Sequence, residues 1–63
     1  MSRLLSLNDV LVRVSLSKSE IYRRMAAGTF PLRVRLGPKR VAFVEQEVDA
    51  WIAAQIEGGR GNG

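Results

Sequence analysis

A run of hydroxyl and basic side chains begins at Ser17 and recurs at helical spacing. Such groups near the start of a helix can donate hydrogen bonds to phosphates and base edges, and a small residue further along lets the helix approach a nucleic-acid groove. Residues at i, i+3, i+4 and i+7 share one helix face. The members of this face are Ser19, Tyr22, Arg23 and Ala26, preceded by Ser17 and Lys18. The spacing predicts a recognition helix for the DNA major groove; the alternative is an ordinary solvated helix face.

A segment with period-two patterning follows. Val34 and Leu36 alternate with arginines, and Val41 and Phe43 resume the alternation after a turn over residues 37–40. This pattern predicts a β-hairpin whose two strands share one apolar face formed by these four residues.

The hairpin segment carries a surplus of positive charge, with no acid anywhere between residues 21 and 44. Exposed hairpins often carry Lys and Arg to discourage edge-to-edge aggregation, and that is the alternative interpretation. The surplus exceeds what this device requires, so we expect a wing that contacts phosphates or inserts an arginine into a narrowed minor groove. The cations are Arg33, Arg35, Lys39 and Arg40, of which Arg35, Lys39 and Arg40 are the predicted contacts.

The sequence contains few residues of the types that catalyse reactions or bind metal ions. The sequence has no Cys and no His, which removes thiolate nucleophiles, imidazole bases and zinc sites built on those ligands. The acidic cluster of Glu45, Glu47 and Asp49 lies where a helix is predicted to begin, and the helix dipole accounts for negative charge there. A chain of 63 residues also leaves little volume for an enclosed substrate cavity. We therefore expect no enzyme activity, no metal and no cofactor.

Two helix starts of the same kind stand close together. Ser6 precedes Asp9, and Ser17 precedes Glu20, by the spacing of a capping box. The first predicts a helix over about residues 7–14, and the second predicts a helix that ends at Gly28, since glycine suits the left-handed position after a helix. Two capped helices with so short a joint predict a helix-turn-helix.

A third helix is predicted from Glu45 onward. Its buried stripe is predicted to hold Val48, Trp51, Ile52 and Ile56, with Trp51 as the largest contribution to the core. Four glycines in the last six residues predict a flexible tail over residues 58–63, which leaves residues 1–57 as the folded domain. The fold class is α+β: a small winged helix-turn-helix with three helices and a two-stranded β-hairpin wing.

Charge is distributed unevenly within a net charge of +4. Residues 1–44 hold nine Lys and Arg against two acids, whereas residues 45–63 hold four acids against one Arg. The first part is therefore expected to face a polyanion. No apolar run is long enough to span a bilayer, and the lack of Cys fits a reducing compartment, so we expect a cytoplasmic protein with no membrane partner.

The order and spacing of four segments resemble the AlpA family of phage and prophage regulators. The segments are residues 15–25, 28–31, 36–41 and 45–52, and the resemblance covers about residues 3–56. It implies a MerR-like winged helix-turn-helix, related to small excisionases, that binds DNA near prophage or genomic-island promoters and attachment sites. It also implies residues 17–24 as the recognition segment and residues 37–41 as the wing. The chain departs from the family at Ala42-Phe43, where Gly followed by Trp is common, although Phe43 can fill the same apolar slot.

These observations predict a sequence-specific, double-stranded DNA-binding transcriptional regulator of a phage, prophage or genomic island. Because one recognition helix reads few base pairs, we expect side-by-side binding on repeated sites or a weak homodimer. One alternative is an excisionase, or recombination directionality factor, that bends DNA and assists an integrase. Another is a protein-interaction adaptor that uses the acidic third helix. The protein partner would be an integrase or RNA polymerase.

Overall fold

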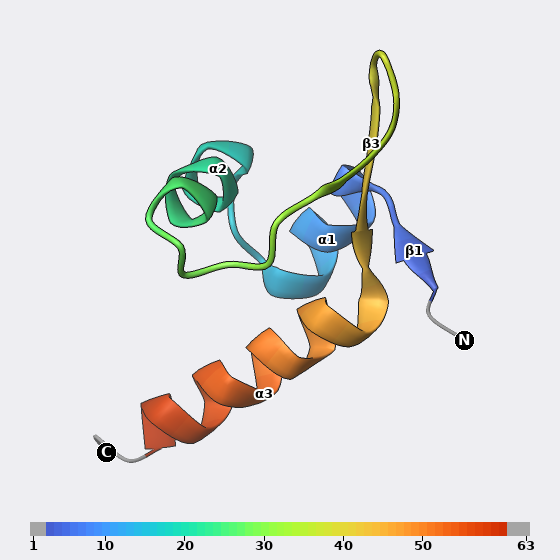
Figure 1. Cartoon of the computed structure of the whole chain (residues 1–63). Helices are drawn as coiled ribbons and strands as arrows, with labels where there is room; N and C mark the ends of the chain where they lie inside the picture. Colours follow the sequence, from blue (N-terminus) through green and yellow to red (C-terminus); the bar gives the residue numbers. More distant parts are fainter. Residues whose placement is uncertain (1–2, 61–63) are drawn as a thin grey trace.

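The computed structural model describes residues 3–60 and folds them into three helices and a small sheet (Figure 1). In chain order the elements are β1 (Leu4–Leu5), α1 (Leu7–Val14), α2 (Lys18–Ala26), β2 (Val34–Gly37), β3 (Arg40–Val44) and α3 (Glu45–Arg60). The sheet is antiparallel with strand order β1-β3-β2. The predicted α+β winged helix with its β2–β3 hairpin is confirmed. Strand β1 is an addition, because two residues are too few for a periodic pattern to predict.

Helices α1 and α2 begin at the predicted caps and are joined by residues 15–17. The Ser6 and Ser17 hydroxyls each accept the backbone N–H three residues further on, at 3.1 and 3.2 Å. Helix α1 ends at Ser15, whose φ of 59° is left-handed and turns the chain sharply toward α2. Gly28 follows the end of α2 at φ +76°, a conformation that glycine adopts without strain. The predicted helix-turn-helix is therefore confirmed.

The register of β2 against β3 differs from the sequence expectation. Val34 lies opposite Ala42, and Arg35 lies opposite Val41. Opposed residues share a face of the sheet and successive residues alternate between faces, so Arg35 lies on the face of Val41 and Phe43. Val34 lies on the other face.

The prediction that the two strands of the hairpin share one apolar face is therefore wrong. Val34 and Leu36 are 38% and 52% exposed, whereas Phe43 is fully buried. Burial does not alternate within the strands either, because Val34, Arg35 and Leu36 are all exposed and Ala42 and Phe43 are both buried. The pairing between the strands has an irregularity between Arg35 and Gly37. A shift of one residue moves every side chain of a strand to the opposite face.

The core lies between the three helices and one face of the sheet. Phe30 packs edge-on against Trp51, with ring centroids 4.8 Å apart. Trp51 is partly buried, and its indole N–H donates to the Thr29 carbonyl at 2.6 Å, which ties α3 to the loop after α2. The fully buried side chains are Val10, Ile21, Phe43 and Val48, from α1, α2, β3 and α3 respectively.

Helix α3 runs to Arg60, beyond the predicted domain end at residue 57. Residues 58–60 are helical where the glycine content predicted the start of a tail, and residues 61–63 of that tail lie outside the described residues. Ile56 is 48% exposed, so its predicted burial is wrong, because α3 extends past the elements that could cover it (Figure 1). Among residues 3–60, no helix is both long and apolar enough to cross a membrane.

Candidate nucleic-acid interface

The solvent-facing side of α2 carries the residues predicted for recognition. Lys18, Ser19, Arg23 and Ala26 are exposed. Tyr22 is half-buried, and its ring packs against the core edge. Ser17, just before α2, is also exposed, and its hydroxyl accepts a backbone N–H as the helix cap, which leaves the hydroxyl hydrogen for donation. The structure thus brings the predicted α2 residues together and leaves Arg23 in solvent.

Glu20 is the acid of this helix, and both of its carboxylate oxygens are engaged. Oε2 accepts from Nη2 of Arg23 at 2.5 Å, and Oε1 accepts from Nε of Arg24 at 3.0 Å. The bond from Arg23 is the main cause that lowers the pKa of Glu20, and it also raises the pKa of Arg23.

The two adjacent arginines differ in their surroundings. The side chain of Arg23 is 74% exposed, whereas that of Arg24 is 34% exposed. The Arg24 guanidinium lies over the Trp51 ring, 5.8 Å from its centroid. Arg24 is therefore packed between α2 and α3, and Arg23 is presented to solvent.

The base of the β-hairpin lies beside α2. The Arg33 guanidinium stands over the Tyr22 ring, 5.5 Å from its centroid. A groove of about 390 Å³ runs between the end of α2 and the hairpin. The register places Arg35 on the face of Val41, so both line this groove. The complete lining is Met25, Leu32, Arg33, Arg35, Pro38 and Val41.

Lys39 and Arg40 lie at the tip of the hairpin, which projects away from the helices (Figure 1). Both are exposed. We call the exposed side of α2 together with the hairpin cations the α2–hairpin surface. Within residues 3–60, five of its cations have no ion pair with an acid: Lys18, Arg33, Arg35, Lys39 and Arg40. The surface therefore carries positive charge that the fold does not neutralise.

The cation of α1 is used inside the protein instead. Nη1 of Arg13 donates to Asp49 at 3.0 Å and to Glu45 at 3.2 Å. These bonds, the one to Asp49 first, raise the pKa of Arg13. They join α1 to the first turns of α3, so part of the acidic cluster of α3 serves the fold.

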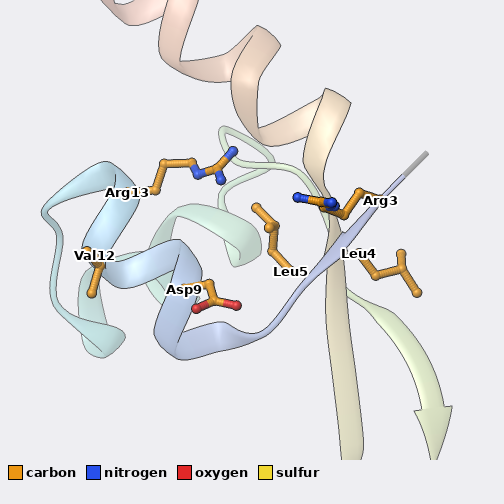
Figure 2. A pocket seen from close by; sticks show the side chains of 6 residues that line it. All are labelled: Arg3, Leu4, Leu5, Asp9, Val12 and Arg13. Carbon is orange, nitrogen blue, oxygen red and sulfur yellow. The ribbon is translucent and has the colours of Figure 1, made fainter. Parts of the chain in front are cut away.

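An open hollow of about 590 Å³ lies between β1 and α1 (Figure 2). Its lining residues are Arg3, Leu4, Leu5, Asp9, Val12 and Arg13. The Asp9 carboxylate accepts the Ser6 backbone N–H at 3.4 Å, and Arg13 is held by α3, so charged groups at the hollow are already used in the fold. In the part of the chain that the structure describes, no cluster of acidic, His or Cys side chains could hold a metal ion.

Sequence comparison decides the family. Residues 3–56 match the family described as prophage CP4-57 regulatory protein (AlpA). The chain belongs to the AlpA family. The resemblance read from the sequence is thereby confirmed at the level of the family, whereas the relation to MerR proteins and excisionases stays a prediction.

One relative of this AlpA-family chain comes from a phage. The uncharacterized protein ORF88 of Enterobacteria phage P4 is 43% identical over 56 residues, which cover 89% of this chain and 64% of that protein. The chain therefore spans a little under two-thirds of that relative's length. No solved structure matches the chain significantly.

Two residues of this AlpA-family chain have surroundings that the sequence pattern does not predict. Arg33 falls in the wing but outside the predicted contacts, yet it stands over Tyr22 and joins the hairpin to α2. The position of Arg33 depends on the path of the loop after α2, and helical or strand periodicity in the sequence does not predict that path. Glu20 fits the capping pattern, yet its carboxylate holds Arg23 and Arg24. The i+3 and i+4 spacing between these charges is the signal that could have revealed this pairing.

Proposed function

We propose that this AlpA-family protein is a sequence-specific, double-stranded DNA-binding transcriptional regulator of a phage, prophage or genomic island. Helix α2 enters the major groove, and the hairpin tip lies on the backbone or in the minor groove. The observation that supports this most is the Arg33 guanidinium over the Tyr22 ring, because it holds the hairpin cations beside α2. A joined cationic surface attracts phosphates and raises the rate of encounter with DNA.

The residues of the α2–hairpin surface divide by what they can contact. Arg23 and Ser19 extend from the exposed stripe of α2 and suit base edges in the major groove. Ser17 and Lys18 lie at the N-terminus of α2, where the helix dipole also favours a phosphate. The remaining groups position the protein on the sugar-phosphate backbone of the DNA. They are the Tyr22 hydroxyl and the cations Arg35, Lys39 and Arg40.

A salt titration tests the proposal. Fluorescence anisotropy with a labelled duplex gives the binding constant at a series of salt concentrations. If about five cations neutralise phosphates, log K falls with log salt at a slope near roughly −4 to −5. A flat line contradicts the proposal.

Assembly on DNA follows from the small size of the reading element. One helix reads few base pairs, so selectivity needs repeated sites bound side by side, a weak homodimer, or DNA deformation. Gel filtration with and without operator DNA distinguishes a dimer in solution from association on DNA. Tight binding of a monomer to a single site contradicts this expectation.

An excisionase role is the second candidate, and the projecting basic hairpin favours it, since an arginine inserted into the minor groove accompanies many DNA bends. This role requires a bend and an integrase as partner, whereas promoter occupancy requires RNA polymerase as the responding partner. Energy transfer between dyes at the two duplex ends measures the bend. An unbent duplex at saturation contradicts the excisionase role and leaves promoter occupancy in place.

The adaptor hypothesis relies on the acidic start of α3. Glu45 and Asp49 already bind Arg13, so less of that acidic surface is available to a partner protein. An Arg23→Ala protein that retains all activity in the host would favour the adaptor over the DNA-binding regulator.

A further inference from the structure

Helices α1 and α2 use the same capping sequence pattern in different ways. In α1 the Asp9 carboxylate accepts the backbone N–H of Ser6 and closes a capping box. Glu20 follows Ser17 by the same three residues, yet its carboxylate accepts hydrogen bonds from Arg23 and Arg24, one turn further along the helix. The acid of α2 therefore has a partner other than its own cap.

The negative charge of Glu20 reduces the attraction of α2 for DNA phosphates. Glu20 is the one acid between Asp9 and Glu45 in the sequence, and it lies on the helix proposed to approach DNA. A carboxylate at this place weakens the field of the neighbouring cations. The dipole of α2 favours negative charge in the first turn, where Glu20 lies, and the geometry of its two ion pairs points to a second role in specificity rather than in raw affinity.

The two ion pairs hold the carboxylate in place. Arg24 binds Oε1 and is itself packed over the Trp51 ring, so it anchors Glu20 to the body of the protein. Oε2 then holds Nη2 of Arg23, while the side chain of Arg23 stays 74% exposed. An arginine has five N–H donors, so this bond orients the guanidinium and leaves further donors for a ligand.

We propose that Glu20 is a positioning residue that holds Arg23 for a base edge and withholds it from phosphates, and this inference rests on the proposed function. An unrestrained arginine pairs with any phosphate in reach, which strengthens binding to every sequence. The Glu20 carboxylate, bonded to Nη2 of Arg23, repels a phosphate that approaches the remaining donors of Arg23. A bidentate contact with O6 and N7 of guanine brings no phosphate charge close to the carboxylate. Glu20 thus lowers affinity for non-target DNA more than for target DNA.

The test compares Glu20→Gln with a matched control. The amide has nearly the shape of the carboxylate but no charge. Glu57→Gln makes the same charge change on the exposed far half of α3, away from the α2–hairpin surface (Figure 1). The target duplex is the one that wild-type protein enriches from a random-sequence pool, and the reference is a scrambled duplex of the same base composition.

We expect Glu20→Gln to bind the scrambled duplex about threefold to tenfold more tightly, with a salt slope steeper by about one, because Arg23 gains a phosphate. Affinity for the target should change by less than about twofold, so the ratio of the two affinities falls. Glu57→Gln should leave that ratio unchanged. In an Arg23→Ala background the effect of Glu20→Gln on the ratio should disappear, because Glu20 acts through Arg23.

Three results overturn the inference: Glu20→Gln weakens both duplexes equally, it behaves as Glu57→Gln does, or its effect on the ratio persists without Arg23. If Glu20→Gln unfolds, Glu20→Asp provides a second variant, which keeps the charge on a side chain that is one methylene shorter. An unchanged ratio of target to scrambled affinity in Glu20→Asp then counts against the inference. Circular dichroism melting identifies an unfolded variant. Wild-type protein that enriches no sequence from the random pool overturns the proposed function itself. Enrichment by wild-type protein, with an unchanged ratio of affinities in the Glu20 variants, overturns the inference alone.

Discussion

Helices α1 and α2 each carry an arginine toward their C-terminal half, and the two arginines have opposite relations to the fold. Arg13 of α1 is 36% exposed and is held by Glu45 and Asp49 of α3. Arg23 of α2 is 74% exposed and is held by an acid of its own helix. A cation bound to another element stabilises the arrangement of elements. A cation bound within its own helix leaves that arrangement unaffected and stays available to a ligand.

Removal of Arg23 should have the largest effect on DNA binding. We expect Arg23→Ala to lose about tenfold or more of the affinity for the target duplex, because a bidentate base contact is lost. The melting temperature should stay within a degree or two, because the ion pair with Glu20 is local to α2. Anisotropy titration and circular dichroism measure the two quantities. Unchanged affinity would place DNA contact elsewhere than on α2.

Removal of the hairpin cations separates contacts with the DNA backbone from contacts with bases. The double variant Lys39→Ala, Arg40→Ala should weaken binding to target and scrambled duplexes alike, by about fivefold, and reduce the salt slope by about two. The hairpin tip is exposed, so the fold should be unaffected. A loss confined to the target duplex would contradict a role in backbone binding.

The converse experiment removes the cation of α1. Arg13→Ala should leave DNA affinity within about twofold of wild type, since Arg13 faces α3 and not the α2–hairpin surface. It should lower the melting temperature by a few degrees, because α1 and α3 lose their ion-pair link. A strong loss of DNA binding in a folded Arg13→Ala protein would erase the distinction between the two arginines.

The smallest expected effect concerns pH. Arg23 holds the pKa of Glu20 below its usual range, so the stabilisation that this pair supplies is present above the unfolded-state pKa of about 4.3 and is lost as pH falls through the folded-state pKa. Melting temperatures from neutral pH to acid should therefore decline slightly less in Glu20→Gln than in wild type. Parallel curves for the two proteins would show that the ion pairs of Glu20 with Arg23 and Arg24 contribute nothing to stability.

The sequence predicts those parts of the fold that depend on local chemistry. Ser6 and Ser17 mark the two helix starts, Gly28 marks a helix end, and alternation marks the hairpin, because caps, left-handed positions and period-two patterns are local properties. Glu20 is the exception among the local signals, because the Ser17 cap and Arg23, each three residues away, and Arg24, four residues away, are all within reach of its carboxylate.

Features that depend on how the chain turns back on itself are not predicted. The pairing of Arg35 with Val41 needs the turn geometry, and the short strand β1 exists because β3 offers it an edge. The contact between Arg33 and Tyr22 needs the loop after α2 to return along that helix. The α2 half of the candidate surface follows from spacing alone. Its union with the hairpin tip was expected only from the winged helix-turn-helix arrangement, and the Arg33–Tyr22 contact that joins the two was not predicted.

Binding as proposed requires α2 and the hairpin tip to contact the same DNA molecule. Amide chemical shifts recorded during titration with the selected duplex test this directly. We expect the largest changes over Lys18–Ala26 and over residues 35–40, with residues 45–60 of α3 little affected. Changes concentrated on α3, or on α2 without the hairpin, would contradict the proposed binding.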